Sequence, residues 1–371
     1  CYILHPIITE VMRKILQSIF RKPVMWMADR FSSNPKQENV HKSLDRLYRD
    51  IQEGVHKKGV IINAGQQEKF IVFSDLHKGA RNGADDFRKA EPNYLQALSY
   101  YLQEGFCYIN LGDSEELWEN GFIPIEKNNK ENFAAEKKFL DAERFYKVFG
   151  NHDVYWNKSV NILAGVGLKI LYRKEIPVYE GLILQYENQP RILLTHGHQG
   201  DGQSDGNFFS AWFVSAIWAP LQSYLALNPN TPSTSDKLKT THNKFMYDWA
   251  ALQQNLLLIT GHTHQPVFES LTHLERLFRS LYFARATGNV VLENETANAI
   301  EKINNKKETK SAGALQVKPC YFNTGCCCFD DGDITGIEID AASIRLIKWS
   351  NQQGKSTRII LEETRFDLLK M

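Results

Sequence analysis

The sequence predicts an α/β fold, and three observations support it. Short apolar runs alternate with longer stretches of helical periodicity, beginning at FIVF (70–73) and continuing with CYINL, FYKVF, RILLT and LLLIT. Each of these five runs ends in a cluster of Asp, Asn or His. The 371-residue chain is 43% apolar, which provides ample core material and excludes a disordered chain or a small disulfide scaffold.

The charge balance and the cysteines limit the partners and the compartment. Lys and Arg number 44 against 43 Asp and Glu, for a net charge of +1, so no general attraction to nucleic acid is expected. The six cysteines show no disulfide spacing, which indicates a reducing, cytoplasmic setting. The consecutive Cys326, Cys327 and Cys328 lie in an apolar stretch, and we interpret them as packed thiols, with a soft-metal or redox site as the alternative.

Residues 1–69 are predicted to form a helical extension. Apolar residues recur at helical spacing from Ile8 to Ile19, with basic residues among and after them, and Pro23 is expected to end the helix. We expect this helix to pack on the protein body; the alternative is a basic helix that lies on a membrane surface.

The catalytic domain is predicted over 70–350, with two inserts and a tail. No charged residue occurs between Gly206 and Ser235. We interpret an insert at about 206–250 as an apolar cap rather than a membrane span, because Pro220 and several serines interrupt it. A second insert, 271–313, is expected as a polar helix or loop, and 351–371 as a C-terminal tail. Turn residues near the end predict closing hairpins.

Polar residues of metal-binding type follow the apolar runs. They stand in SDLH (Asp75, His77), GDSEE (Asp113), GNHD (Asn151, His152), THGH (His196) and GHTH (His262, His264). Oxygen and imidazole donors without thiolate suit Mn²⁺, Fe or Zn²⁺. The donors suffice for two ions if one carboxylate bridges them, and paired ions are a standard device for hydrolysing phosphate esters.

These motifs resemble those of the calcineurin-like metallophosphoesterases, whose signature D-x-H, G-D-x-x-(D/E), G-N-H-(D/E), H and G-H-x-H occurs here in order. The closing YFNTG is also similar to the family's last strand segment. The resemblance implies a sandwich of two mixed β-sheets flanked by helices, and two divalent ions, with Mn²⁺ first and Fe or Zn²⁺ as alternatives. It assigns Asp75, His77, Asp113 and His264 to one ion, and Asp113, Asn151, His196 and His262 to the other. A hydroxide that bridges the ions would attack the phosphorus.

The resemblance also implies roles beside the metals. His152 would contact the phosphate or protonate the leaving group, with Asp153 or Glu116 holding its imidazole. Glu116 would also orient its neighbours. His198 is expected either to hydrogen-bond a ligand or to close a turn. Arg81 is placed where it could clamp a phosphate, although a solvated arginine is equally compatible with its position.

The motifs indicate a subclass as well. GDSEELW and GHTHQP look like the UDP-2,3-diacylglucosamine diphosphatase branch, although that branch usually has Arg in place of His152. We expect a small-molecule phosphate ester as substrate, with residues 208–227 admitting a lipid-linked or nucleotide-sugar compound. Lipid or membrane-surface contact through 208–227 or the N-terminal helix would place the protein at the inner membrane face. A nuclease and a non-catalytic scaffold are the alternative functions.

Overall fold

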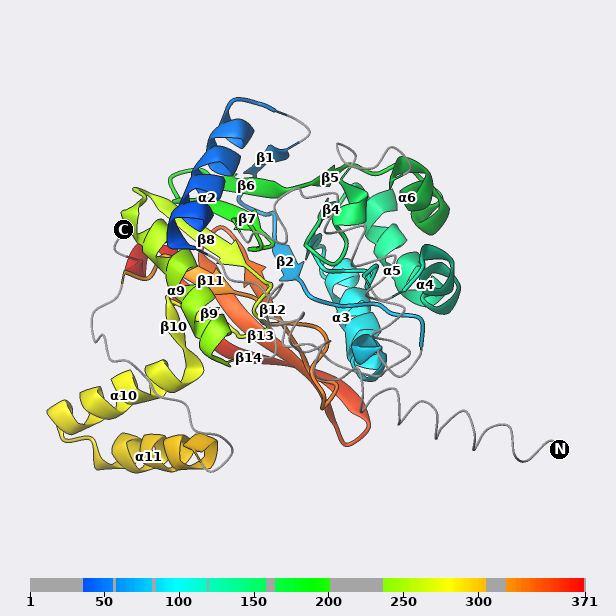
Figure 1. Ribbon diagram of the computed structural model, residues 1–371. Helices are drawn as coiled ribbons and strands as arrows, with labels where there is room; N and C mark the ends of the chain where they lie inside the picture. Colours follow the sequence, from blue (N-terminus) through cyan, green and yellow to red (C-terminus); the bar gives the residue numbers. More distant parts are fainter. Residues whose placement is uncertain are drawn as a thin grey trace, which may run out of the picture.

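The computed structural model describes residues 36–55, 58–81, 85–118, 120–157, 164–200, 236–304 and 318–369 (Figure 1). The predicted N-terminal helix and the charge-free segment, including 208–227, lie outside the described residues.

Two seven-stranded mixed sheets form the body, which confirms the predicted α/β sandwich. The first sheet has the strand order β1 (Gly59–Ala64), β6 (Gly181–Tyr186), β7 (Arg191–Thr195), β8 (Leu256–Thr260), β11 (Tyr321–Asn323), β9 (Val267–Phe268) and β10 (Leu271–Thr272). The second has the order β14 (Lys355–Arg365), β13 (Ser343–Gln352), β12 (Ile334–Ile339), β2 (Phe70–Phe73), β3 (Cys107–Leu111), β4 (Phe145–Val148) and β5 (Val178–Tyr179). The five predicted strands are β2, β3, β4, β7 and β8.

The predicted strands are largely apolar because both faces of each sheet are covered. In β2, Phe70 and Val72 belong to the core cluster between the sheets, whereas Ile71 and Phe73 belong to a second cluster under the helices. This alternation follows from the two-residue period of a strand. Parallel pairing of β2 with β3, of β3 with β4, and of β7 with β8 then brings their carboxyl ends to common edges.

Helices cover both sheets (Figure 1). α2 (Gln37–Gln52) and α9 (Asp236–Leu252) pack together and on the first sheet. α3 (Glu91–Gln103), α4 (Phe122–Asn128), α5 (Lys130–Asp141) and α6 (Ala164–Tyr172) gather beside β2–β5. Short 3₁₀ turns occupy η1 (Asp86–Lys89), η2 (Val154–Trp156) and η4 (Phe366–Leu368). None of the helices in this described part of the chain has the length and apolar character needed to cross a bilayer.

The sandwich extends further along the chain than the expected 70–350. Within the predicted extension, α2 buries Val40, Leu44 and Ile51 in the central core, and β1 pairs in parallel with β6. Within the predicted tail, β14 pairs along its length with β13 as an edge strand. β1 and β14 are edge strands of their sheets, and β14 carries several charged residues, as a strand with one open side can.

The two predicted inserts differ in their relation to the core: the described part of the first packs into it, and the second projects from the sheets. Residues 236–250, expected in the apolar cap, belong to α9, whose Met246, Trp249 and Ala250 lie in the central core. The second insert contains α10 (His273–Thr287) and α11 (Val290–Asn304), a hairpin that projects from the sheets (Figure 1). A capping box formed by Thr272 and Glu275 begins α10.

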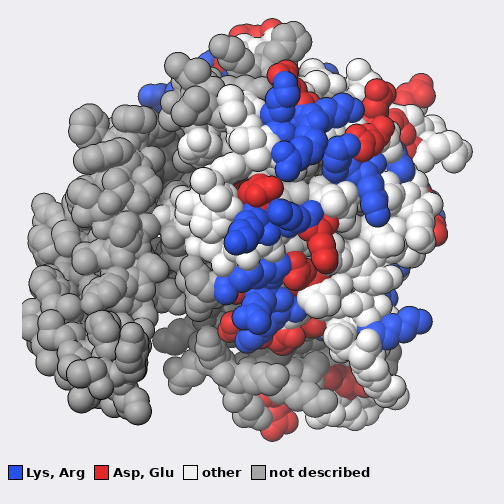
Figure 2. Space-filling model, turned by 90° about the vertical axis from the view of Figure 1, so that its right-hand side faces the viewer, with Lys and Arg blue, Asp and Glu red and all other residues white. Residues whose placement is uncertain are grey.

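The charge distribution is mixed on the side of the molecule shown in Figure 2. There Lys and Arg side chains form a band that Asp and Glu interrupt repeatedly. Pairs such as Lys137 with Asp141 in α5 and Arg173 with Glu126 show this interspersion on the α4–α6 helices.

Candidate metal centre

The predicted ligands converge because each follows the carboxyl end of a strand. Asp75 and His77 follow β2, Asp113 follows β3, and Asn151 follows β4; His196 follows β7, and His262 and His264 follow β8. Backbone hydrogen bonds join these loops directly. Within one sheet the Asp75 amide donates to the Gly112 carbonyl at 3.0 Å, and within the other the Gly261 amide donates to the His196 carbonyl at 2.9 Å. Between the sheets, the His262 amide donates to Oδ2 of Asp75 at 3.0 Å. The loops of both sheets therefore form one connected site.

The ligand backbone is strained. Five proposed ligands have positive φ angles: Asp75 (53°), His77 (51°), Asp113 (49°), His262 (69°) and His264 (55°). Left-handed backbone is uncommon for residues other than glycine. Each such conformation costs about 1–3 kcal/mol and persists where the surrounding structure imposes it, often at functional sites. The concentration of strain at these positions supports a functional role for the loops.

Two motif glycines allow the close approach of the carboxylates. A Cβ atom on Gly150 of GNHD would lie 2.1 Å from Oδ1 of Asp113, and a Cβ on Gly261 of GHTH would lie 2.4 Å from Oδ2 of Asp75. Since any side chain would collide with a ligand atom, glycine is required at both positions.

The ligand atoms form two groups that share one carboxylate. The groups Asp75, His77, Asp113 and Asp113, His196, His262 each place their candidate ligand atoms within 4.8 Å of one another. Oδ2 of Asp113 lies 3.1 Å from Nε2 of His196 and 3.9 Å from Nε2 of His77. His264 joins through its Nε2, which is 3.2 Å from Oδ1 of Asp75. Asp113 thus occupies the position of a bridging ligand.

Unsatisfied buried atoms show that these residues fit divalent cations. Oδ1 of Asn151 is buried and has no hydrogen-bond partner, and a buried acceptor without a donor is costly. Nδ1 of His196 lies 2.9 Å from the Leu111 carbonyl. Because a carbonyl can only accept, Nδ1 carries the proton and Nε2 presents its lone pair beside Asp113. Neutral imidazole, amide oxygen and carboxylate together make a suitable donor set.

The electrostatics of the site also favour cations. Burial alone would lower the pKa of His77, but Glu116, Asp113 and Asp75 raise it to about 10. Burial would raise the pKa of Asp113, but His196, His152 and His77 hold it well below its usual value. The site therefore holds an additional proton on His77 next to ionised carboxylates. A divalent cation that binds here replaces such protons.

Glu116 connects the ligands to His152. Its carboxylate lies 2.8 Å from Nδ1 of His77 and 2.8 Å from Nδ1 of His152. The His152 ring stacks on Trp118, with centroids 4.1 Å apart and an interplanar angle of 21°. Burial would lower the pKa of His152, but Glu116 and Asp113 raise it. His152 is thus held in a defined orientation next to the ligand cluster, and its neighbours favour the protonated ring.

The other predicted residues have different surroundings. Of the two carboxylates proposed for His152, only Glu116 contacts it; Asp153 accepts from the amides of Gly150 at 2.6 Å and Ser114 at 2.9 Å. These two bonds fix the loop that carries Asn151.

The roles predicted for Arg81 and His198 stay predictions. The Arg81 guanidinium pairs with Glu91 and donates to the Asn128 carbonyl at 3.3 Å, so a phosphate would have to compete with an ion pair. His198 is buried beside His196, its Nδ1 has no hydrogen-bond partner, and burial and His196 lower its pKa to about 3.

Several residues that support the site were not among the predicted site residues. Asn323 of YFNTG donates to the Gly261 carbonyl at 2.6 Å and so holds the GHTH turn. Of the three adjacent cysteines, Cys326 and Cys327 are buried, as predicted, while Cys328 is half-buried with Sγ 3.8 Å from Nδ1 of His264. Trp118 was visible only as part of GDSEELW, and His242, in α9, followed no strand. Its ring centroid lies 5.1 Å from that of His262.

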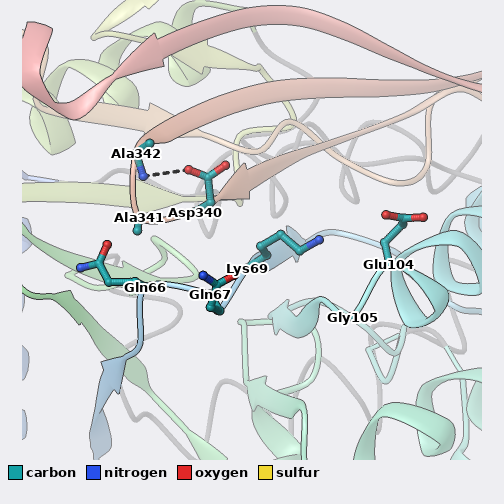
Figure 3. A pocket seen from close by; sticks show the side chains of 8 residues that line it. All are labelled: Gln66, Gln67, Lys69, Glu104, Gly105, Asp340, Ala341 and Ala342. Carbon is teal, nitrogen blue, oxygen red and sulfur yellow. Dashed lines mark hydrogen bonds between the residues drawn. The ribbon is translucent and has the colours of Figure 1, made fainter.

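A separate cavity of about 700 Å³ lies at the opposite strand ends (Figure 3). Lys69, directly before β2, and Gly105, just before β3, line it together with Glu104 and Asp340. It is open and polar, and the Asp340 carboxylate there accepts from the Ala342 amide at 2.8 Å. This cavity contains none of the predicted ligands.

Comparison with known proteins gives one family and several remote structural likenesses. Residues 68–266 match the calcineurin-like phosphoesterase family. A search of curated proteins found no significant match. Three similar solved structures are a predicted phosphoesterase from Streptococcus pneumoniae TIGR4 (14% identity, 79% of this chain, 97% of that chain, TM-score 0.27), vacuolar protein sorting 29 from Cryptosporidium parvum (11%, 80%, 98%, 0.30) and a dimetal phosphatase from Danio rerio (11%, 81%, 99%, 0.34).

Proposed function

Because the chain belongs to the calcineurin-like phosphoesterase family, we propose that it hydrolyses a phosphate ester with the help of two divalent cations. One observation supports this most directly: the buried Asp113 carboxylate belongs to two separate groups of potential ligands. A scaffold that only retained the fold would have no use for so many costly polar groups in one buried cluster.

The residues that would hold the cations divide into two sets that meet at Asp113. One set is Asp75, His77, Asp113 and His264; the other is Asp113, Asn151, His196 and His262. When bound, a pair of divalent cations lowers the pKa of water toward neutrality and neutralises charge on phosphoryl oxygens. Mn²⁺ is our first choice, with Fe and Zn²⁺ as alternatives.

His152 supplies the proton for the departing oxygen. Glu116 accepts from Nδ1 of His152, so the proton available for transfer is the one on Nε2. Stacking on Trp118 keeps the ring in one plane. The backbone amide of His152 donates to Oδ1 of Asp113 at 2.8 Å, which ties the acid to the bridging ligand. A general acid placed in this way contributes about 10²–10⁴ in rate.

We further propose a small-molecule substrate, either a phosphomonoester, a phosphodiester or a pyrophosphate. The uncharged 208–227 segment supports a lipid-linked or nucleotide-sugar compound at the cytoplasmic membrane face. Comparing hydrolysis of acylated and deacylated nucleotide-sugar diphosphates tests this preference. Equal rates for the two compounds would contradict a lipid-linked substrate but would not contradict the proposed esterase activity.

Metal dependence is tested with the purified chain, Mn²⁺ and bis-p-nitrophenyl phosphate. We expect turnover that EDTA abolishes and Mn²⁺ restores. Asp113→Asn should remove activity and reduce bound metal to one equivalent or less, because both ligand sets lose a carboxylate oxygen. Asp141→Asn, at an exposed position in α5, is the matched control and should behave as the parent. If the parent protein binds no metal and cleaves no ester, the proposed hydrolase function is wrong and the non-catalytic scaffold is the correct one.

The role of His152 is tested by changing the leaving group. p-Nitrophenolate departs without a proton, whereas phenolate and alkoxide need one. His152→Asn should therefore slow phenyl phosphate hydrolysis by about 10²-fold or more and p-nitrophenyl phosphate hydrolysis by much less. An equal loss on both substrates would assign His152 to phosphate binding instead.

A further inference from the structure

The three adjacent cysteines do not share one environment. Cys326 and Cys327 are 1% and 0% exposed, whereas Cys328 is half-buried, and it is the one cysteine of the described ranges that is not buried. Its Sγ lies 3.8 Å from Nδ1 of His264. Packing in the core accounts for the first two thiols. The third faces a cluster of metal-binding side chains, which indicates a further role for it.

The backbone hydrogen bonds of the cysteine triplet fix Cys328 beside the ligand loop that follows β2. The Cys327 amide donates to the Asp75 carbonyl at 3.1 Å, and the Thr335 amide, in β12, donates to the Cys326 carbonyl at 3.0 Å. The Cys326 amide in turn donates to Oγ1 of Thr335 at 3.2 Å. Because Asp75 and a central strand both hold this segment, the position of Cys328 next to the ligands is a property of the fold.

Cys328 forms one group of potential metal ligands with His77 and His264. One candidate ligand atom of each side chain lies within 4.8 Å of those of the other two, and the Nε2 atoms of the two histidines are 3.2 Å apart. Both histidines belong to the set proposed for the first cation, together with Asp75 and Asp113. Bonds of about 2.3 Å to sulfur and about 2.0–2.1 Å to nitrogen hold the ligand atoms of a tetrahedral zinc ion about 3.6 Å apart. A movement of about 1 Å by the half-buried Cys328 side chain therefore suffices to bring all three atoms onto one ion.

Sulfur changes the chemical character of the first cation position. Carboxylate oxygen favours Mn²⁺, imidazole suits Zn²⁺ and Fe, and thiolate selects softer ions such as Zn²⁺. The set proposed for the second cation, which consists of Asp113, Asn151, His196 and His262, includes no cysteine. A thiolate at one position only makes the two positions differ in the ion that they prefer.

We propose that Cys328 is a further ligand of the first cation and that its sulfur increases the preference of this position for Zn²⁺ over Mn²⁺. When the metal–sulfur bond forms, the S–H bond of Cys328 breaks and its proton passes to solvent. The half-buried side chain gives that proton a path to water. This inference rests on the proposed function, because it concerns one of the two proposed cations.

Co²⁺ tests the sulfur bond directly, because thiolate bound to Co²⁺ produces a charge-transfer band in the near ultraviolet that oxygen and nitrogen ligands do not produce. The metal-free chain is titrated with Co²⁺ chloride in the absence of oxygen. We expect the band to appear with one of the two bound equivalents. It should be lost in Cys328→Ser and kept in the matched control, Cys107→Ser, because Cys107 is a buried thiol at the start of β3, the end remote from Asp113.

Competition between Zn²⁺ and Mn²⁺ tests the preference. Serine keeps the size of the side chain and replaces sulfur by a harder oxygen. Cys328→Ser should therefore weaken Zn²⁺ binding at one equivalent by about 10-fold or more, which is at least the loss caused by removing the hydrogen-bond partner of a ligand. Mn²⁺ binding should change by less than about threefold. Cys107→Ser should bind both ions as the parent does.

Two bound Co²⁺ ions without the charge-transfer band would overturn the proposal and leave Cys328 as a hydrogen-bond partner of His264. This result needs only the parent protein, so it does not depend on how a variant folds. A band that persists in Cys328→Ser, or equal losses of Zn²⁺ and Mn²⁺ binding in that variant, would also overturn the proposal. In each of these cases the proposed function stands, whereas a parent that binds no metal overturns both.

Discussion

A buried cluster of four charges supports the ligand loops and predicts a large effect for one substitution, Lys147→Met. Nζ of Lys147 lies 2.9 Å from Oε2 of Glu115, and Nζ of Lys78 lies 3.1 Å from Oε1 of the same residue. Lys78 also pairs with Glu136 at 2.6 Å. All four side chains are inaccessible to solvent. Lys78 and Glu115 directly adjoin His77 and Glu116, so the cluster fixes the base of the site.

The magnitude follows from the pKa of Glu115. Burial would raise this pKa, but Lys147 and Lys78 outweigh burial and lower it from 4.5 to about 2. A shift of this size corresponds to about 3 kcal/mol of stability at neutral pH. Removal of one partner of a buried pair typically costs about 3–5 kcal/mol. We therefore expect Lys147→Met to lower the free energy of unfolding by about 3 kcal/mol at pH 7.

The pH dependence has a defined sign. A carboxyl with a depressed folded-state pKa contributes stability above its unfolded pKa, and this contribution is lost as the pH falls from 4.5 toward 2. Lys147→Met raises the folded-state pKa of Glu115, so the variant has less of this contribution to lose. The stability gap between the parent and the variant should be smaller by about 1 kcal/mol at pH 4 than at pH 7.

Urea unfolding of metal-free protein at pH 7 and pH 4 measures both effects. Lys137→Met is the control, because Lys137 pairs with Asp141 on an exposed helix face, where such pairs contribute about 0.5 kcal/mol or less. A Lys147→Met variant within about 1 kcal/mol of the parent at pH 7, or a gap that widens at pH 4, would refute this account of the cluster.

Three further predictions concern the site and the projecting hairpin. Gly150→Ala should abolish binding of the second metal equivalent, measured by metal analysis after dialysis, because its Cβ would collide with Asp113; two retained equivalents would contradict this. Glu116→Gln should weaken metal affinity by about 10–100-fold through His77, which a Co²⁺ titration measures, and unchanged affinity would rule out an orienting role. Thr272→Ala should destabilise α10 by about 1 kcal/mol, seen as faster amide exchange confined to that helix; faster exchange across the sheets would show that the hairpin does not unfold separately.

The strands that carry the ligands were predictable because both their faces are buried. FIVF is apolar throughout, CYINL and LLLIT are apolar except for Asn110 and Thr260, and in the structure every residue of these runs is buried. β13 and β14 form a hairpin that turns at Gln353 and Gly354, where the turn residues predict one, whereas β1 was not recognised as a strand. Both β1 and β14 lie at the edges of their sheets and show mixed burial patterns, as strands with one open side do.

The supporting residues of the site were less predictable than its ligands. Ligands stand at fixed short spacings after strands, so Asp75 and His77 are recognisable from their own neighbours in the chain. His242 and Asn323 lie beside the GHTH turn that follows β8, although about 20 and 60 residues of sequence separate them from it. Nothing in the local sequence around them indicates the partner, because the contact exists only once α9 and β11 pack beside β8.

The sequence by itself determined the fold class, the positions along the chain of the strands that carry the ligands, and the chemical type of the metal site. It could do so because apolar periodicity and short motifs are local properties of the chain. Only the tertiary structure decided which side chains lie beside the predicted site residues: Glu116 rather than Asp153 beside His152, Glu91 beside Arg81, and His242 beside His262. The physical reason is that hydrogen bonds and ion pairs act over about 3–4 Å, and those distances are set by the packing of helices and sheets from distant parts of the chain.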